Sequence, residues 1–460
     1  MDQPRKLKST ISRRAFALAA GFMVMACAGT LSHPGVERST TLGPGVALAT
    51  FDTLWSKVSK TYVDTAFVAG PWSRVRDSLR SRATGITSRD ELDALLKDML
   101  ATIPDSHFYI VPAAAAGDDS SSRESDGRGT TGLALRMMGG QVVVWRVDAG
   151  GPAATAGIRA GSIVEKVGEK DVTTLLRRID AMPEKARQRA KSGMLHGLNG
   201  LLSPAAGDSV VVRLAKPALT RALVAVPAKG RVSQFGNLPP MAAIVSAARV
   251  PLGAGSGCAG MIAFNIWLPE LSGELERAVD SVATCSGVVL DLRGNPGGLG
   301  AMVMGFGGYF VDSTLSLGTM RTRQVSLRFA INPRRSRSDG SQHAPFTGPL
   351  AILVDGMTAS TSEIFASGMQ RIGRARVFGE RTAGAALPAL MERLPSGDVF
   401  VHAVADFTDP RGARIEGAGV VPDETVMLSE QALTEGRDTA LEAAVRWIGT
   451  VAAKQMGRTR

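Results

Sequence analysis

The sequence predicts an α/β core with a largely parallel sheet, preceded by a helical domain and a β-rich domain. Short apolar runs that end at turn residues are typical of buried strands, and the core has such runs at 261–267, 288–292, 350–354 and 399–405. Helical patterns lie between these runs. Strands that alternate with helices indicate a largely parallel sheet, with mixed pairing at its edges. We therefore predict an α/β core over 230–450.

The composition excludes several classes of protein. The chain has 460 residues, of which 44% are hydrophobic, and this length is sufficient for two or three domains with cores of their own. The formal charge is +11, but most basic residues are scattered along the chain, and the excess includes an N-terminal group and the segment 334–337. We interpret that segment as a solvated loop and expect no nucleic-acid partner. The chain has no zinc-ligand spacing, Walker loop or dinucleotide fingerprint, so we expect no metal and no cofactor.

Residues 1–29 are predicted to be an export signal. Ser12–Leu18 (SRRAFAL) resembles a twin-arginine export motif, and the ten residues 17–26 form an apolar segment too short to span a bilayer. Two cleavage sites remain open. Val24-Met-Ala-Cys resembles a lipobox, which would leave Cys27 lipid-modified, whereas Ala26-Cys-Ala fits an ordinary signal peptidase. In both cases we expect export to the periplasm or cell envelope, with membrane contact through a lipid anchor at most.

A helical domain is predicted at 45–112, after a tether at 30–44. Its first helix is indicated by apolar residues at helical spacing, namely Phe51, Leu54, Trp55, Val58 and Tyr62. Ser88 caps a second helix, with Glu91 three residues later as in a capping box. A polar, low-complexity segment at 113–128 follows and is predicted to be a linker.

The β-rich domain is predicted at 129–228. Gly132, Leu133, Ala134 and Leu135 precede a strand at 142–147 and a glycine-rich turn at 150–161, and this pattern resembles a PDZ domain. In that fold the Gly-Leu-x-Leu loop binds a peptide's C-terminal carboxylate beside an open strand edge. A module that serves only as a scaffold is the alternative.

Two stretches of the core carry residues suited to acyl transfer. The strand ending at Leu292 runs into Arg-Gly-Asn-Pro-Gly297-Gly298, and paired glycines let backbone amides approach a substrate closely. The strand 350–354 is followed by Thr-Ala-Ser360-Thr-Ser-Glu363 and then by a helical pattern. A hydroxyl at that turn lies beside unpaired N–H groups at the helix start, where negative charge is stabilised. Ser360 is therefore the candidate nucleophile, although the same residues fit an ordinary helix cap.

These two stretches together resemble the peptidase family that contains the C-terminal processing (tail-specific) proteases and the tricorn core. The resemblance implies a ClpP/crotonase-like core with a mixed sheet and an acyl-enzyme on Ser360. It also implies an oxyanion hole formed by the amide of Thr361 and one amide from Gly297 or Gly298. No cofactor is implied, and the partner is a peptide or protein substrate.

The resemblance leaves the general base to be assigned, because a serine hydroxyl needs one at neutral pH. In the tail-specific branch the base is a lysine in a G-E-x-T-x-G-K run, but here the run Gly379–Ala385 ends in alanine. From Gly230 to Ala453 there is no lysine. Asp105-Ser-His-Phe is similar to the Ser-His pair of the tricorn core, which implies that His107 is the base. The tricorn-like branch, which includes retinoid-binding proteins, also has a glutamate late in the chain. This implies that Ser106 and Glu416 orient His107.

Two further expectations concern the cysteines and the alternative function. Cys258 and Cys285 each precede a predicted core strand, so parallel neighbouring strands would bring them within reach of a disulfide in an oxidising compartment. Two buried thiols are the alternative. The overall prediction is an exported serine endopeptidase, and a non-catalytic ligand- or peptide-binding protein on the same fold is the competing hypothesis.

Overall fold

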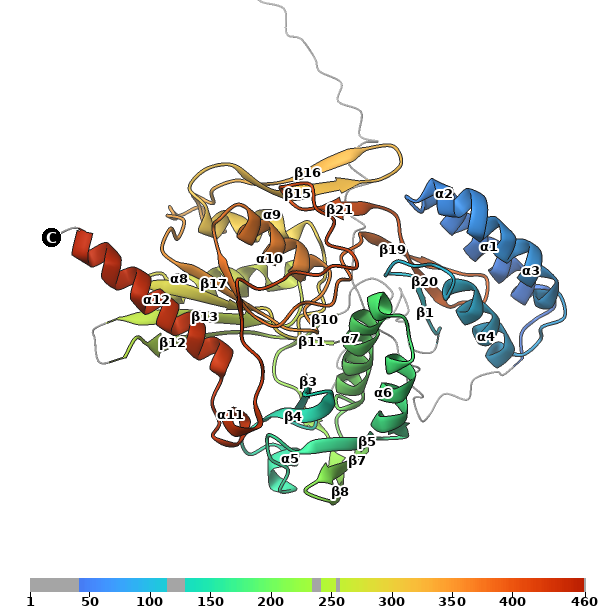
Figure 1. Ribbon diagram of the computed structural model, residues 1–460, viewed down its shortest axis with the longest axis horizontal. Coiled ribbons are helices and arrows are strands. Elements are labelled where there is room, and N and C mark those ends of the chain that lie inside the picture. The colour runs from blue at the N-terminus through green and yellow to red at the C-terminus, as the bar shows by residue number, and fades with distance from the viewer. Residues whose placement is uncertain (1–40, 114–128, 234–240, 254–256, 459–460) are drawn as a thin grey trace, which may run out of the picture.

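The core of the protein is a six-stranded sheet with helices on both faces (Figure 1). The computed structural model describes residues 41–113, 129–233, 241–253 and 257–458. The strand order is β12-β13-β14-β17-β18-β22, and every pair is parallel except the antiparallel edge pair of β12 and β13. The strands are β12 (Val245–Pro251), β13 (Cys258–Phe264), β14 (Gly287–Asp291), β17 (Leu350–Val354), β18 (Arg376–Gly379) and β22 (Glu424–Thr425).

Alternate side chains of these strands pack against helices on opposite faces of the sheet. Val288 and Leu290 contact the larger core cluster, which includes residues of three helices on one face, α8 (Ser272–Val282), α9 (Met302–Gly307) and α10 (Thr361–Arg371). Val289 and Leu353 contact Ile448 and its neighbours on the other face, on α12 (Thr439–Arg458). The apolar runs lack polar alternation because both faces of the sheet are covered.

Three of the four predicted core strands differ from the structure, and the smallest difference is that the run 288–292 forms β14 one residue earlier, at Gly287–Asp291. The run 261–267 forms β13, which begins and ends three residues earlier, at Cys258 and Phe264. The run 399–405 forms β20 (Val399–Ala403), which lies outside the core sheet and pairs with β1 (Tyr109–Val111) and β19 (Ala389–Arg393). This prediction was wrong because an apolar run does not say which strand it pairs with.

The N-terminal helices are docked on that three-stranded sheet. They are α1 (Val46–Thr61), α2 (Thr65–Phe67), the π-helix η1 (Val68–Trp72), α3 (Ser73–Ala83) and α4 (Arg89–Leu100). Their buried cluster also includes Leu394 and Phe400, which come from the β19–β20 hairpin of the C-terminal part. The chain then leaves α4 and enters β1, so the turn that carries His107 is held against the core by strand pairing.

The β-rich part is an antiparallel sheet in the order β3-β4-β5-β7-β8, covered by helices. It comprises β3 (Leu133–Met138), β4 (Gln141–Val147), α5 (Pro152–Thr155), β5 (Ile163–Val167), β6 (Lys170–Asp171), α6 (Val172–Asp180), α7 (Glu184–Leu201), β7 (Ser209–Lys216) and β8 (Leu219–Val224). A two-stranded ribbon of β2 (Gly129–Thr130) and β9 (Val226–Pro227) joins the two ends of this part.

The edge strand β3 is not open where the sequence predicted it to be. The side chain of Asn199, on α7, accepts a hydrogen bond from Leu135 N–H at 2.9 Å and donates one to Leu135 C=O at 3.2 Å. Both backbone groups of this residue are therefore paired.

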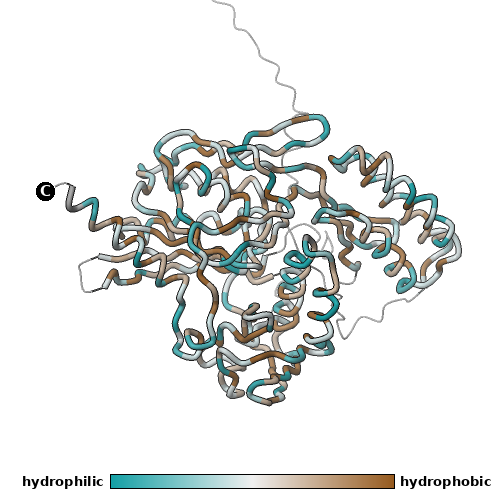
Figure 2. Tube along the Cα trace, in the orientation of Figure 1, coloured by the Kyte–Doolittle hydropathy of each residue, from teal (hydrophilic) through white to brown (hydrophobic). Residues whose placement is uncertain are grey.

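The remaining elements complete the core and its rim. They are β10 (Arg231–Ser233), β11 (Met241–Ala243), η2 (Pro269–Leu271), η3 (Gly308–Phe310), β15 (Leu315–Arg321), β16 (Ser326–Ile331), β21 (Asp406–Thr408) and α11 (Glu430–Thr434). The basic segment 334–337 is not simply solvated, because Arg334 and Arg337 form ion pairs with Glu276 and Asp280 of α8. Figure 2 shows hydrophobic residues concentrated in the central strands and hydrophilic ones toward the outer loops. Among the described residues, no helix is long and apolar enough to cross a membrane.

Cys258 and Cys285 are joined by a disulfide. Cys258 is the first residue of β13, and Cys285 lies just before β14. These two strands are parallel neighbours, as the pairing of Ala259 with Gly287 shows. The two cysteines are 27 residues apart in the sequence. The bridge therefore closes a loop that contains α8.

Removing this disulfide is expected to destabilise the core. Loop-closure entropy for a loop of this length corresponds to about 3.5 kcal/mol in the free energy of unfolding. Urea denaturation of the wild type, with and without reductant, measures the difference, and the double variant Cys258→Ser/Cys285→Ser is the control. Reductant should leave the stability of the double variant unchanged, whereas identical midpoints for reduced and oxidised wild type would contradict the prediction.

Candidate active site

Ser360 lies at a sharp turn between β17 and α10, in a backbone conformation that non-glycine residues rarely adopt. Its φ is 56° and its ψ is −122°. Within the described residues, Ser360 and His107, whose φ is 62°, are the two non-glycine residues with positive φ. Such conformations cost on the order of 1–3 kcal/mol and concentrate at functional sites. The two residues proposed from the sequence as nucleophile and base are therefore the two strained ones.

The helix-cap interpretation of Ser360 also holds. Ser360 and Glu363 form a capping box at the start of α10. The N–H of Ser360 lies 3.1 Å from Glu363 Oε2 and 2.8 Å from the carbonyl oxygen of Ala385. Capping fixes the turn, and it does not compete with a chemical role because the same turn is found at strand–turn–helix nucleophiles.

The paired glycines lie directly against this turn. A Cβ on Gly297 would be 2.7 Å from Cβ of Ser360, so a larger residue does not fit there. The N–H of Gly297 donates to Asn295 Oδ1 at 3.0 Å. The N–H of Gly298 has no acceptor among the residues that the structure describes. The carbonyl oxygen of Gly298 accepts a hydrogen bond from Thr361 Oγ1 at 2.6 Å, which brings Gly298 and the first residue of α10 together.

His107 is part of a buried hydrogen-bond chain. Ser106 Oγ lies 2.6 Å from His107 Nδ1 and donates to Glu416 Oε2 at 2.8 Å, while Ser106 N–H donates to Glu416 Oε1 at 2.7 Å. Because the single hydroxyl hydrogen of Ser106 is directed to the carboxylate, Ser106 Oγ accepts from Nδ1–H. A neutral imidazole then has its lone pair on Nε2, and this buried atom has no hydrogen-bond partner within the described parts of the chain.

Glu416 accepts hydrogen bonds from three separate parts of the chain. Besides Ser106, its donors are Ala386 N–H at 2.8 Å and Arg189 Nη1 of α7 at 3.2 Å. Burial raises the pKa of Glu416, while the bond from Ala386 and the charge of Arg189 act in the opposite direction. Burial also lowers the pKa of His107 to about 3, with a smaller contribution from Arg189, so the resting imidazole is neutral.

A single peptide group, between Ala385 and Ala386, links Ser360 to the chain of Glu416, Ser106 and His107. Ala385 accepts the N–H of Ser360, and the next residue, Ala386, donates to Glu416. His107 Nε2 is not hydrogen-bonded to Ser360. The structure thus joins Ser106, His107 and Glu416 directly and links them to Ser360 through adjacent backbone groups. The position of the tail-specific lysine is occupied by the fully buried methyl group of Ala385.

A cavity of about 450 Å³ borders His107. Its lining includes Ser106 and His107, Arg189 of α7, and apolar residues of the helical part such as Leu100 and Ile103. A cavity of this size beside a buried imidazole provides room for a substrate side chain.

The other histidines are placed elsewhere. His402, fully buried on β20, lies 2.6 Å from Glu392 Oε2 and 3.2 Å from Thr61 Oγ1, which gives it a structural role. His196 Nε2 lies 2.9 Å from the carbonyl oxygen of Met357. His343 is buried beside Tyr309. His33 and Cys27 lie outside the described residues.

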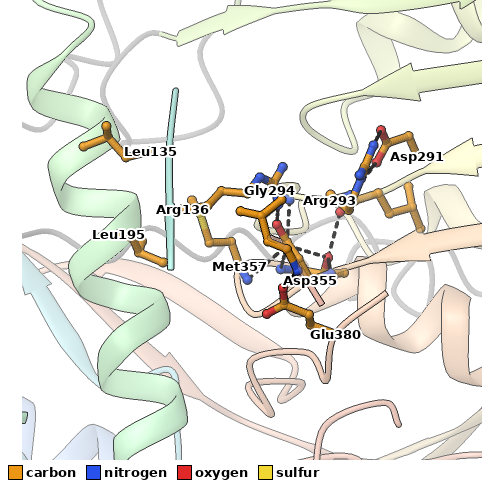
Figure 3. A network of polar contacts seen from close by, with 12 residues as sticks. Leu135, Arg136, Leu195, Asp291, Arg293, Gly294, Asp355, Met357 and Glu380 are labelled. Carbon is orange, nitrogen blue, oxygen red and sulfur yellow. Dashed lines mark hydrogen bonds and ion pairs between the residues drawn. The ribbon is translucent and has the colours of Figure 1, made fainter. Parts of the chain in front are cut away.

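A charged network lies between the β-rich part and the core (Figure 3). Asp291 accepts hydrogen bonds from the backbone and side chain of Arg293, and these bonds hold the start of the glycine turn. Arg136, reaching in from β3, forms an ion pair with Asp355. Burial lowers the pKa of Arg136 to about 9. Neither the position of Arg136 nor the bond from Arg189 to Glu416 could be found from sequence, because no local pattern records contacts between such distant segments.

Comparison with known proteins agrees with this fold. Residues 259–426, from β13 to just beyond β22, match the model of Peptidase family S41. The chain is 26% identical over 413 residues to the chloroplastic C-terminal processing peptidase of Tetradesmus obliquus, an alignment that covers 87% of this chain and 81% of that protein. It is 25% identical over 399 residues to the carboxyl-terminal-processing protease of Synechocystis, with 85% and 84% covered.

Solved structures share the fold. The photosystem II D1 C-terminal processing protease superposes with a TM-score of 0.56 at 24% identity and covers 88% of this chain and 98% of its own. Mature CPAF gives a TM-score of 0.62 at 13% identity, with 89% and 98% covered. The protein is a serine-type peptidase. It carries a Peptidase family S41 domain, and the predicted resemblance to the tail-specific proteases is confirmed.

The low pKa of His107 predicts acid sensitivity of the fold. An unfolded histidine binds a proton below about pH 6.5, whereas the folded one does so only near pH 3, so its contribution to stability is present above pH 6.5 and is lost as the pH falls toward 3. Between pH 7 and pH 5 the loss is on the order of 2 kcal/mol.

Urea denaturation at both pH values tests this prediction with the wild type and His107→Gln, which should lose less stability on acidification. Burial also lowers the pKa of His196, to about 4, and this acts in the same direction. The free energy of unfolding of His107→Gln/His196→Gln should therefore depend still less on pH. Equal pH dependence in wild type and His107→Gln would contradict the prediction.

Proposed function

We propose that the protein is an exported serine endopeptidase that cleaves peptides or unfolded protein segments through an acyl-enzyme on Ser360. His107 Nε2 removes the hydroxyl proton as Ser360 Oγ attacks the scissile carbonyl, and it returns that proton to the leaving amine. Water then attacks the acyl-enzyme with the same base, and Ser360 is regenerated.

The observation that carries this proposal is the chain from Glu416 through Ser106 to His107. It orients the imidazole with Nδ1 as donor, so the lone pair at Nε2 is available to accept the hydroxyl proton of Ser360 when substrate is bound. When the imidazolium forms, the buried carboxylate of Glu416 stabilises its charge through the intervening hydroxyl. The arrangement resembles the one that the sequence motifs imply for the tricorn core, and it would let a core without lysine between Gly230 and Ala453 activate a serine.

The amides of Thr361 and Gly298 are proposed to form the oxyanion hole. Gly298 is preferred to Gly297 because the N–H of Gly297 is engaged with Asn295, whereas that of Gly298 has no acceptor among the described residues. Thr361 contributes an amide at the positive end of the helix dipole of α10.

The other parts of the chain are proposed to serve the same reaction. The antiparallel sheet of 129–228 is interpreted as a PDZ-like module in which a peptide pairs with β3 by displacing the side chain of Asn199 from Leu135. The N-terminal residues are interpreted as an export signal with or without lipidation at Cys27. A non-catalytic binding protein is less well supported, because the similar proteins are named as peptidases and the Ser106–His107–Glu416 chain has no use in a simple container.

Labelling with a fluorophosphonate probe tests the proposed nucleophile and base. The wild type should be labelled and Ser360→Ala should not, because the probe forms its bond with an activated serine. His107→Ala should label roughly 100-fold more slowly or worse, since general-base catalysis contributes about that much. Peptide hydrolysis should decline in parallel.

Ser367→Ala is the matched control, because Ser367 is a buried serine of the same helix that has no part in the mechanism. It should label like the wild type. Persistent labelling of Ser360→Ala would reject Ser360 as the nucleophile, and normal labelling of His107→Ala would reject His107 as the base.

A further inference from the structure

Besides Glu416, a second carboxylate is fully buried at this site, and the reaction described above does not use it. Glu363 lies one turn after Ser360 on α10 and has no exposed surface. Its Oε1 accepts hydrogen bonds from Thr382 Oγ1 and from Gly384 N–H at 2.8 Å. Its Oε2 accepts from Ser360 N–H at 3.1 Å and from Ala385 N–H at 2.9 Å. A helix cap requires only one of these four contacts.

All four groups that face Glu363 are donors. The hydroxyl of Thr382 accepts the N–H of Val420 at 2.7 Å, so its own hydrogen is directed to Glu363. The other three groups are backbone N–H groups, which can only donate. The ionised form of Glu363 satisfies all of them, whereas a protonated carboxyl would turn an O–H toward a donor and break one bond.

These bonds hold the segment 382–386, which lies between the nucleophile and the base. Ala385 accepts the N–H of Ser360, and Ala386 donates to Glu416. Gly384 is fixed from the other side, because its carbonyl oxygen accepts the N–H of Gly417, next to Glu416, at 2.9 Å. The segment is therefore tied to Ser360 through Glu363 and to His107 through Glu416 and Ser106.

We propose that Glu363 is a positioning residue for the reaction, whose carboxylate holds segment 382–386 so that the Ser360 hydroxyl and His107 Nε2 stay aligned. This inference rests on the proposed function. Glu363 touches neither the substrate nor the reacting atoms, and it acts by fixing the separation of the groups that do. Small displacements of such groups are costly, because proton transfer requires hydrogen-bond distance.

The electrostatic surroundings make this role dependent on pH. Burial raises the pKa of Glu363 to about 7; its hydrogen bonds lower it and the nearby charge of Glu416 raises it further. Glu416 is itself bonded to the cation of Arg189, and the facing groups of segment 382–385 are neutral donors. Since His107 is neutral down to about pH 3, loss of activity near pH 7 would be due to protonation of Glu363 and not to protonation of the base.

The test measures kcat and KM for a peptide substrate of the wild type, Glu363→Gln and Glu363→Asp between pH 5.5 and 9. We expect Glu363→Gln to lower kcat by about tenfold or more with little change in KM, because misalignment affects proton transfer more than binding. The wild-type kcat should fall below about pH 7. This acid limb should disappear in Glu363→Gln, which cannot titrate, and should persist in Glu363→Asp at a lower maximum.

Glu276→Gln is the matched control, because Glu276 is a buried glutamate of α8 that accepts hydrogen bonds from Tyr309 and Ser338 away from the site. It should retain the wild-type kcat and acid limb. Thr382→Val, which removes a single donor, provides a milder variant if Glu363→Gln does not fold, and it should lower kcat and move the acid limb to higher pH. A wild-type kcat and acid limb in Glu363→Gln, or in Thr382→Val when it alone folds, would overturn the inference.

The two proposals fail in different ways. Full activity of Ser360→Ala would reject the proposed function whatever the Glu363 variants do. Loss of activity in Ser360→Ala together with an unchanged acid limb in Glu363→Gln would reject only the role of Glu363.

Discussion

The geometry of the site depends on the buried carboxylate of Glu416. Burying a carboxylate costs several kcal/mol unless hydrogen bonds compensate for the lost water. Here the compensation comes from Ser106, Arg189 and Ala386, which are 310, 227 and 30 residues away in the sequence. One ionisable group thus draws together the helical part, the β-rich part and the core, and the imidazole of His107 is aligned as a result.

The strained backbones of Ser360 and His107 are explained by the same contacts. Ser360 is held between α10, Ala385 and the glycine turn, and Gly297 lies so close that no side chain fits. His107 is held by Ser106 on one side and by the pairing of β1 with β20 on the other. Each strained conformation persists because several surrounding contacts fix it, which is how proteins retain strain at reactive positions.

The sequence predicted the local features better than the distant ones. The strand 350–354 was predicted with the bounds that the structure has, because five buried residues are followed at once by Asp355 and Gly356. The bounds of β13 were displaced because the apolar run continues through Ile266, Trp267 and Leu268, which are buried but lie beyond the strand. The run 399–405 was assigned to the wrong sheet because strand pairing is decided by tertiary contacts.

The site shows the same division. The turn at Ser360 has a local signature, and the paired glycines have one too. Ser106, His107 and Glu416 were identified through resemblance to a family, since nothing in their immediate neighbours indicates that they meet. Glu363 belongs to a segment whose sequence fits a helix cap, but its bonds to Thr382, Gly384 and Ala385 arise from the fold and have no counterpart in local sequence.

The side chain of Asn199 has a consequence for ligand affinity along β3. Its amide resembles a peptide bond and already satisfies Leu135 on both sides. An incoming strand would exchange those two hydrogen bonds for two similar ones, so backbone pairing at this residue contributes little net free energy. Tight binding there would have to arise from side-chain burial, and the module would consequently discriminate among ligands by their side chains more than by their extended shape.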